Sequence, residues 1–241
     1  MAKDDRTPAA GPTTPATKSA RADIDAFLQQ ARTLTAAKTV SGKRGRLVFA
    51  MDATMSRQPT WDIACSLQAD MFTEAAGVGG LDIQLIYFRG IGECRASRFV
   101  SDAKELGTLM SRINCHGGHT QIGRVLSHTR KENEAQKVQA LVFVGDAMEE
   151  KLDDLCAAAG ELGILGVPAF LFQEGDDPVA EQAFRELARL SNGAYCRFSP
   201  GAAHELAELL RAVAAYAAGG LKALGSARRG SAAAKLLAQM K

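Results

Sequence analysis

The sequence predicts an α/β protein with a doubly wound, mostly parallel six-stranded sheet and helices on both faces. Two apolar runs, residues 47–51 and 141–145, each end in a single aspartate, Asp52 and Asp146. Such runs are typical of strands that are buried on both faces of a parallel sheet. From Arg46 onward, strand patterns alternate with helix patterns, which favours parallel strands connected by helices.

The six strands are predicted from short apolar runs bounded by turn residues. The run at 81–88 begins with alternating apolar and polar residues, which indicates a less buried strand, and the segment at 94–100 is expected at an edge of the sheet. In chain order, the predicted strands are 47–52, 81–88, 94–100, 140–145, 167–172 and 194–198.

The helices are predicted from apolar residues spaced three or four positions apart, as Ile63, Leu67 and Met71 are. Asn192-Gly193 ends one helix and Ser199-Pro200 begins the last, because glycine is common just after a helix and proline at its first position. The predicted helices are 59–77, 103–113, 120–134, 149–163, one that carries Val179 to Leu190, and one that buries Leu206 to Val213.

Residues 46–218 are predicted to form one domain, with different segments on either side. Residues 1–20 are rich in Pro, Thr and Ala and are expected to be disordered, and residues 21–45 are expected to form an amphipathic helix and a basic linker. Residues 219–241 form a basic C-terminal tail, which we expect to be mobile and to bury no core. Its short apolar stripe packs on the domain in one interpretation and docks on a partner in another.

The composition argues against several classes of protein. The formal net charge of +2 divides into +4 for residues 1–45, −7 for residues 46–218 and +5 for residues 219–241. Basic ends on an acidic domain argue against a dedicated nucleic-acid-binding domain. No apolar run is long enough to span a membrane, and the first residues are too polar for a secretory signal. Five cysteines without C-x-x-C spacing do not indicate disulfides, so we expect a cytoplasmic protein.

Polar oxygen donors follow the two strands that end in aspartate. Asp52, Thr54 and Ser56 alternate along one segment, Thr120 follows a Gly-Gly turn, and Asp146 ends the second strand. In open α/β sheets, ligands bind beyond the carboxyl ends of the strands, where the strand order reverses. Carboxylates and hydroxyls are hard oxygen donors that suit Mg²⁺ or Mn²⁺. In the alternative interpretation, Thr54, Ser56 and Asp146 only cap the helices that follow them.

The set Asp52-x-Thr54-x-Ser56, Thr120 and Asp146 resembles the metal-ion-dependent adhesion site of von Willebrand factor A (VWA) domains, and the order of the elements agrees over most of the chain. The family usually has serine where this chain has Thr54, whose methyl group crowds the site. The resemblance implies a Rossmann-like fold and a bound Mg²⁺ or Mn²⁺ ion. It implies that Thr54 and Ser56 contact the ion directly and Asp52 largely through water, with Thr120 and Asp146 on the far side.

The resemblance also implies a function without catalysis. In that family an Asp or Glu of another protein completes the coordination of the ion, and intracellular relatives often act as adaptors beside ATPase or chaperone systems. We therefore expect a metal-dependent adaptor domain that recognises an acidic group of a partner protein, and we expect no enzyme activity.

A phosphohydrolase is the main alternative. The segment Val144–Glu150, a Gly-Asp pair with acidic residues shortly after it, resembles the last motif of the haloacid dehalogenase superfamily. In that interpretation Asp52 is the nucleophile of a Mg²⁺-dependent reaction. Thr54, however, stands where that superfamily has the aspartate that serves as general acid and base, and two more strand–helix units follow the motif.

A zinc site is the third interpretation. Cys115, His116 and His119 lie close together in the sequence, and Cys94 is the next cysteine towards the N-terminus. Zinc in proteins is bound by such nitrogen and sulfur ligands. The spacing fits no common zinc motif, and His119 also adjoins Thr120, so it can instead line the rim of the oxygen-donor site.

Overall fold

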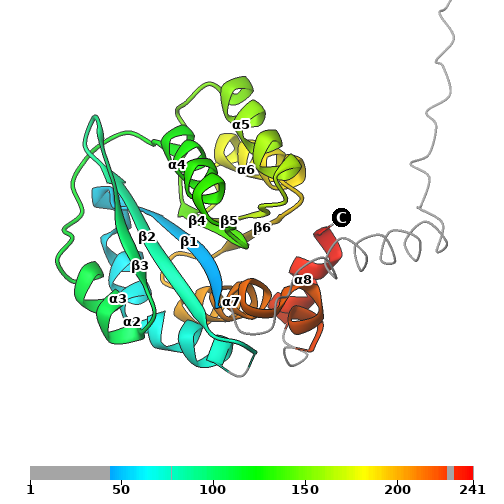
Figure 1. Cartoon of the computed structure of the whole chain (residues 1–241). Helices are drawn as coiled ribbons and strands as arrows, with labels where there is room; N and C mark the ends of the chain where they lie inside the picture. The colour runs from blue at the N-terminus through cyan, green and yellow to red at the C-terminus, as the bar shows by residue number, and fades with distance from the viewer. Residues whose placement is uncertain (1–43, 77, 227–230, 241) are drawn as a thin grey trace, which may run out of the picture. The chain divides into compact units, whose positions relative to one another are not determined.

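The centre of the fold is a six-stranded sheet (Figure 1). The structure is a computed structural model that describes residues 44–76, 78–226 and 231–240. Its strands are β1 (Gly45–Asp52), β2 (Leu81–Arg89), β3 (Glu93–Val100), β4 (Ala140–Gly145), β5 (Ala169–Glu174) and β6 (Ala194–Phe198). The strand order is β3-β2-β1-β4-β5-β6. All neighbouring strands are parallel except β3, which runs antiparallel to β2. Strand β3 lies at one edge of the sheet, as predicted.

Helices cover both faces of the sheet (Figure 1). One face carries α2 (Gln58–Ala76), α3 (Ala103–Met110), α7 (Ala203–Ser226) and α8 (Ser231–Gln239), and the other carries α4 (Ile122–Ala135), α5 (Leu152–Ile164) and α6 (Pro178–Leu190). Each layer of helices has its own buried apolar cluster against the sheet, and each helix contributes the apolar side chains on one of its faces. Helix α6, for example, contributes Ala183, Phe184 and Leu187. The predicted doubly wound α/β fold is confirmed.

The two strands that end in aspartate lie side by side in the middle of the sheet. Every residue of β1 and of β4 is buried, which explains their unbroken apolar sequences. Their registers align Met51 with Val144, so both chains leave the sheet at the same edge. The strand order reverses here, because the chain continues from β1 towards β2 on one side and from β4 towards β5 on the other.

The C-terminal segment packs on the domain. Helix α7 continues to Ser226, beyond the predicted boundary at residue 218, with a kink at Gly220, whose φ of 68° favours glycine. Leu224 and, in α8, Leu236 are fully buried in the same apolar cluster as α7. The expectation that residues 219–241 bury no core is therefore wrong, because the short apolar stripe finds its partners on α7 and β6.

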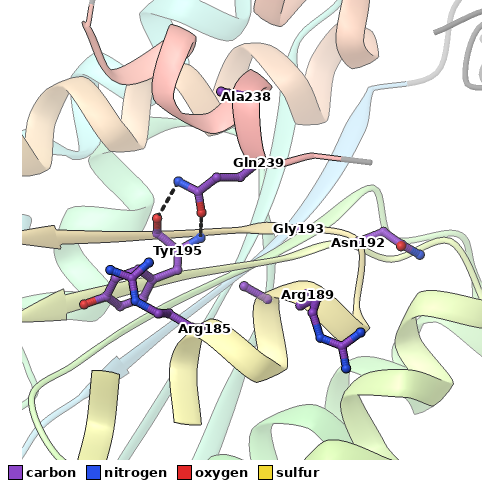
Figure 2. A pocket seen from close by; sticks show the side chains of 8 residues that line it. Arg185, Arg189, Asn192, Gly193, Tyr195, Ala238 and Gln239 are labelled. Carbon is purple, nitrogen blue, oxygen red and sulfur yellow. Dashed lines mark hydrogen bonds between the residues drawn. The ribbon is translucent and has the colours of Figure 1, made fainter. Parts of the chain in front are cut away.

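Helix α8 also completes the outer edge of the sheet, as Figure 2 shows. The side-chain amide of Gln239 accepts a hydrogen bond from the backbone nitrogen of Tyr195 (2.9 Å) and donates one to its carbonyl oxygen (2.8 Å). Tyr195 belongs to the edge strand β6, so these two backbone groups have no neighbouring strand to bind on that side. The glutamine amide takes the place of a peptide group from a seventh strand.

Some predictions on the ends of the chain lie outside the described residues. This applies to the disordered segment 1–20 and to most of the helix and linker at 21–45, although Gly45 already belongs to β1. In the part of the chain that the structure describes, no helix has both the length and the apolar character needed to cross a membrane.

Candidate metal-binding site

Three loops meet beyond the carboxyl ends of β1 and β4. The first follows β1 and contains the short helix η1 (Met55–Arg57), the second precedes α4, and the third joins β4 to α5. The second loop is anchored by backbone hydrogen bonds from His116 to the carbonyl oxygen of Ala53 (2.9 Å) and from His119 to that of Gly90 (3.1 Å). Gly118 lies so close to the backbone of Gly90 that a side chain would not fit there.

Four of the five predicted ligand residues form one connected group. The hydroxyl of Ser56 donates a hydrogen bond to Oδ2 of Asp146 (3.0 Å), and it lies 3.3 Å from the hydroxyl of Thr54. The backbone nitrogen of Thr54 donates to Oδ1 of Asp52 (2.8 Å). Asp52 is buried, Thr54 and Asp146 are half-buried, and Ser56 is exposed, so the group reaches from the sheet to the surface.

The helix-capping interpretation of these residues is wrong. Thr54 occupies the N-cap position of η1, but its side chain makes no capping hydrogen bond. The N-cap residue of α5 is Lys151, five positions after Asp146. The hydroxyl of Ser56 is directed to Asp146 across the sheet edge. The oxygen atoms therefore gather around one another, and helix stability does not explain their arrangement.

Thr120, the fifth predicted ligand, is held by the loop that follows Asp146. Its hydroxyl accepts a hydrogen bond from the backbone nitrogen of Glu149 (3.1 Å), and its own backbone nitrogen donates to the carboxylate of Glu149 (3.2 Å). The next residue, Glu150, accepts from the first backbone nitrogens of α4, those of Ile122 (2.5 Å) and Gly123 (3.0 Å). The role of Thr120 as a ligand stays a prediction.

These contacts also explain why two helices begin later in the chain than predicted. Helix α4 begins at Ile122 and α5 at Leu152, two or three residues later than predicted. The residues in between form the two loops that Glu149 and Glu150 join together.

Burial sets the charge of the site. The pKa of Asp52 is raised to about 6: burial is the largest cause and the nearby charge of Asp146 adds to it, while hydrogen bonds from Thr54 and the positive charge of Arg57 partly offset them. Asp52 is thus a carboxylate that is held ionised at neutral pH against a substantial desolvation penalty. A bound cation would offset this penalty directly.

Two charged residues that the sequence reasoning missed lie behind the oxygen atoms. Arg57 follows Ser56 directly, yet only 1% of its surface is exposed, and its Nη1 forms an ion pair with Glu174. Glu174 is the last residue of β5 and also accepts a hydrogen bond from the hydroxyl of Thr60 (2.5 Å). A polar residue at the end of a buried strand was the signal used for Asp52, and it would have found Glu174 as well. No sequence signal marks Arg57 as buried.

The structure does not support the zinc interpretation. Among the described residues, no group of three or more His, Cys, Asp or Glu side chains is arranged to hold a metal ion. Cys115 is buried, and burial with the nearby charge of Asp52 raises the pKa of its thiol to about 11, which disfavours the thiolate that zinc requires. His119 contacts the carboxylate of Glu149 instead (2.8 Å).

The oxygen donors fit a small divalent ion. Mg²⁺ takes six oxygen ligands at about 2.1 Å, so that adjacent ligands lie about 3.0 Å apart. The Ser56–Asp146 distance of 3.0 Å and the Thr54–Ser56 distance of 3.3 Å match this spacing. Two carboxylates take part, those of Asp52 and Asp146, and the other donors are hydroxyl groups.

Comparison with solved structures shows which fold this is. A von Willebrand factor type A protein from Catenulispora acidiphila superposes with a TM-score of 0.58 at 17% identity, over 73% of this chain and 43% of that one. The VWA domain of SpRpn10 gives 0.54 at 12% identity, over 69% and 95%. An aerotolerance-related membrane protein from Bacteroides fragilis gives 0.54 at 18% identity, over 69% and 96%.

The likeness lies in the structure alone. No protein-family model matches the sequence, and no curated protein matches it either. At these identities the solved structures show the fold, and the chain therefore has the VWA fold that its motifs predict.

Proposed function

We propose that this VWA-type domain binds one Mg²⁺ or Mn²⁺ ion beyond the carboxyl ends of β1 and β4 and uses it to hold an acidic side chain of another protein. The observation that carries the proposal is the spacing of the oxygen atoms of Thr54, Ser56 and Asp146, at 3.0 and 3.3 Å. Hydroxyl and carboxylate oxygens at this spacing can occupy adjacent positions around a small ion. Asp52 and Thr120 complete the proposed set.

The charge balance favours an additional, external ligand. Asp52 and Asp146 balance the charge of a divalent ion, while the hydroxyls add oxygen atoms without adding charge. The ion therefore stays able to attract a carboxylate from outside. Ser56 is exposed, as is the neighbouring Met55, with 67% of its surface accessible, so a partner protein can reach this edge of the sheet.

The resemblance and the cysteines support a proposal for the biological setting. The VWA resemblance favours an adaptor that acts beside an ATPase or chaperone system. All five cysteines are free thiols, which fits a reducing compartment such as the cytoplasm. We assign no catalytic residue, because Thr54 cannot serve as the general acid and base of the alternative phosphohydrolase reaction. Mg²⁺-dependent hydrolysis of an aryl phosphate, lost in Asp52→Asn, would contradict this assignment.

Isothermal titration calorimetry on the full chain tests the metal site. We expect one Mg²⁺ or Mn²⁺ ion per chain, and loss of binding in Asp52→Ala, because the substitution removes one of the two charges that balance the ion. Asp153→Ala is the matched control, since Asp153 is an exposed aspartate in the first turn of α5. Equal binding by Asp52→Ala and the control would show that the ion binds elsewhere.

A pull-down in Mg²⁺ and in EDTA tests the second half of the proposal. We expect a partner that the wild-type chain retains only with the metal and that Asp52→Ala does not retain. A partner retained equally in both conditions would show that the site does not mediate recognition.

A further inference from the structure

A basic groove lies between the start of β3 and the outward face of α4. It has a volume of about 350 Å³ and is lined by Cys94, Gly123, Arg124, Ser127, His128 and Lys131. None of these residues is acidic, although the formal net charge of residues 46–218 is −7. The groove therefore differs in charge from the domain as a whole.

The two cationic residues of the groove are not neutralised by neighbouring carboxylates. Most arginines of the described residues form ion pairs, but Arg124 and Lys131 form none within this part of the chain. Two acidic residues near the groove have other partners. Glu132 pairs with an arginine at the start of β1 (3.1 Å), and Glu150 accepts hydrogen bonds from the first backbone nitrogens of α4 (2.5 and 3.0 Å). The groove can therefore attract an anion from outside.

The guanidinium of Arg124 is held in place at one end of the groove. Its Nη1 donates hydrogen bonds to the carbonyl oxygen of Gly92 (2.6 Å) and to the side-chain oxygen of Gln121 (3.1 Å). Its Nε and Nη2 donate to no residue that the structure describes, and the side chain is exposed. A guanidinium that is already positioned, with donors to spare, loses little conformational freedom when it binds a carboxylate.

The polar side chains of the groove follow one face of α4. Arg124, Ser127, His128 and Lys131 occupy positions i, i+3, i+4 and i+7 of the helix. Burial, partly offset by Glu132, lowers the pKa of His128, so the positive charge lies at the two ends of this row. Seven helical residues rise about 10 Å, which is the length of about three residues of an extended chain. Two cations at this separation fit two carboxylates of an extended segment, whereas a single phosphate requires donors that converge on one point.

The groove begins next to the proposed metal site. Gly123, which lines it, is only three residues after Thr120. The backbone nitrogen of Gly123 donates to Glu150 (3.0 Å), which belongs to the loop that follows Asp146. The same two loops therefore shape the metal site and the inner end of the groove.

We infer that the groove between β3 and α4 binds an acidic, extended segment of the partner protein, whose carboxylates contact Arg124 and Lys131 while another of its carboxylates is held by the metal ion. The inference rests on the proposed function for the contact with the metal, and it adds the kind of partner and the direction in which its chain continues. Complementary charges of this kind orient a partner and speed its association.

Fluorescence anisotropy with a fluorescein-labelled hexaglutamate peptide, in Mg²⁺ and about 0.15 M salt, tests the inference. We expect Arg124→Gln/Lys131→Gln to bind the peptide about tenfold more weakly than the wild-type chain does. The matched control is Lys104→Gln/Lys235→Gln, which removes the same charge from exposed positions on α3 and α8, in the opposite layer of helices. Its affinity should be unchanged, and an equal loss in both variants would overturn the inference.

A second variant and a cross-linking measurement guard against indirect effects. Lys131→Glu leaves the fold intact, because the side chain of Lys131 makes no hydrogen bond with any described residue, and circular dichroism confirms this. We expect it to weaken peptide binding about fivefold. Hexaglutamate that carries a benzophenone should cross-link to residues 123–131, as mapped by mass spectrometry. Unchanged affinity in the folded variant, or cross-links confined to residues 1–43 or 219–241, would overturn the inference.

Asp52→Ala separates the groove from the metal site. We expect this variant, and EDTA, to weaken hexaglutamate binding as well. If neither has an effect while Arg124→Gln/Lys131→Gln still does, the proposed function is contradicted and the groove is supported. Binding that depends on Mg²⁺ but not on Arg124 and Lys131 would overturn the groove and leave the proposed function intact. Tighter binding of hexathymidylate than of hexaglutamate, lost in the same groove variant, would overturn the assignment of a protein partner.

Discussion

The two ends of the sheet differ in how fully their charged and polar groups are paired. At the amino end of β1, the guanidinium of Arg46 pairs with Glu132 (3.1 Å), donates to the carbonyl oxygen of Gln136 (2.5 Å) and stacks on the ring of Phe99 (3.8 Å from carbon to ring centre). Beyond the carboxyl end of the same strand, two nitrogens of the buried Arg57 have no hydrogen-bond partner in the part of the chain that the structure describes.

Polar groups near the amino end of the edge strand β6 are also satisfied. Near its amino end, both backbone groups of Tyr195 are matched by the amide of Gln239 (Figure 2). Near the carboxyl ends of β1 and β4, by contrast, Asp52 is held ionised although burial raises its pKa to about 6. The groups compared at the amino end stabilise the fold, whereas the burial of the ionised Asp52 at the carboxyl end lowers stability, next to the proposed metal site. Such perturbed groups are concentrated at functional sites.

The largest expected effect is on metal binding at the carboxyl end. Asp52→Asn should weaken Mg²⁺ binding by about 100-fold, because it removes one of two charges that balance the ion. Calorimetry measures the affinity, and Glu132→Gln at the amino end is the control, with no expected change. A similar loss of affinity in both variants would remove the distinction between the two ends.

The second prediction concerns pH. The pKa of Asp52 is about 6 in the folded chain and 3.8 ordinarily, so the folded state binds the proton more tightly. The stability gained from this proton is present below about pH 4 and is lost as the pH rises through about 6, by about 3 kcal/mol. Urea unfolding in EDTA should therefore show that Asp52→Asn is more stable than the wild type by a margin that grows between pH 4 and pH 7. A constant margin would mean that Asp52 has an ordinary pKa.

Stabilisation by Mg²⁺ should also depend on the ionisation of Asp52. Mg²⁺ competes with the proton at Asp52, so the rise in melting temperature on adding Mg²⁺ should be larger at pH 7.5 than at pH 5. Differential scanning calorimetry measures both values, and Asp52→Asn should show neither rise.

A smaller effect is expected from the ion pair at the amino end. Arg46→Met should lower the free energy of unfolding by about 2 kcal/mol, since it removes the contacts to Glu132 and Gln136 and leaves the partly buried carboxylate of Glu132 with only its contacts to Gln84 and His128. Mg²⁺ affinity should not change. Chemical denaturation gives the stability, and Arg95→Met, at an exposed arginine of β3, is the control. A stability loss accompanied by weaker metal binding would indicate that the two ends are coupled.

The smallest effect concerns the edge of β6. Gln239→Ala removes two hydrogen bonds to Tyr195 and should lower the free energy of unfolding by about 1 kcal/mol. Hydrogen exchange should show faster exchange of the Tyr195 amide, while Lys235→Ala, an exposed position on the same helix, should leave it unchanged. Unaltered exchange in Gln239→Ala would show that α8 does not protect this edge.

The sequence by itself determined the sheet and most of the oxygen-donor group. Unbroken apolar runs are required where a strand is buried on both faces, so β1 and β4 could be recognised, and with them Asp52 and Asp146 at their ends. Thr54 and Ser56 followed because they are close to Asp52 along the chain. Local spacing fixed their position near the end of β1, and the structure brings Ser56 to Asp146.

Only the tertiary structure decided which distant groups pair with one another. Arg57 is polar, follows a polar motif and would ordinarily be exposed, yet Glu174 from β5 holds it inside the domain. Thr120 stays a predicted metal ligand, and the structure adds that its hydroxyl accepts a hydrogen bond from the backbone nitrogen of Glu149. The sequence left open whether the apolar stripe of residues 219–241 packs on the domain or docks on a partner, and the contacts of α8 with α7 and β6 show that it packs on the domain. In each case the deciding contact joins segments far apart in the chain, and no local pattern of hydrophobicity or propensity records such a contact.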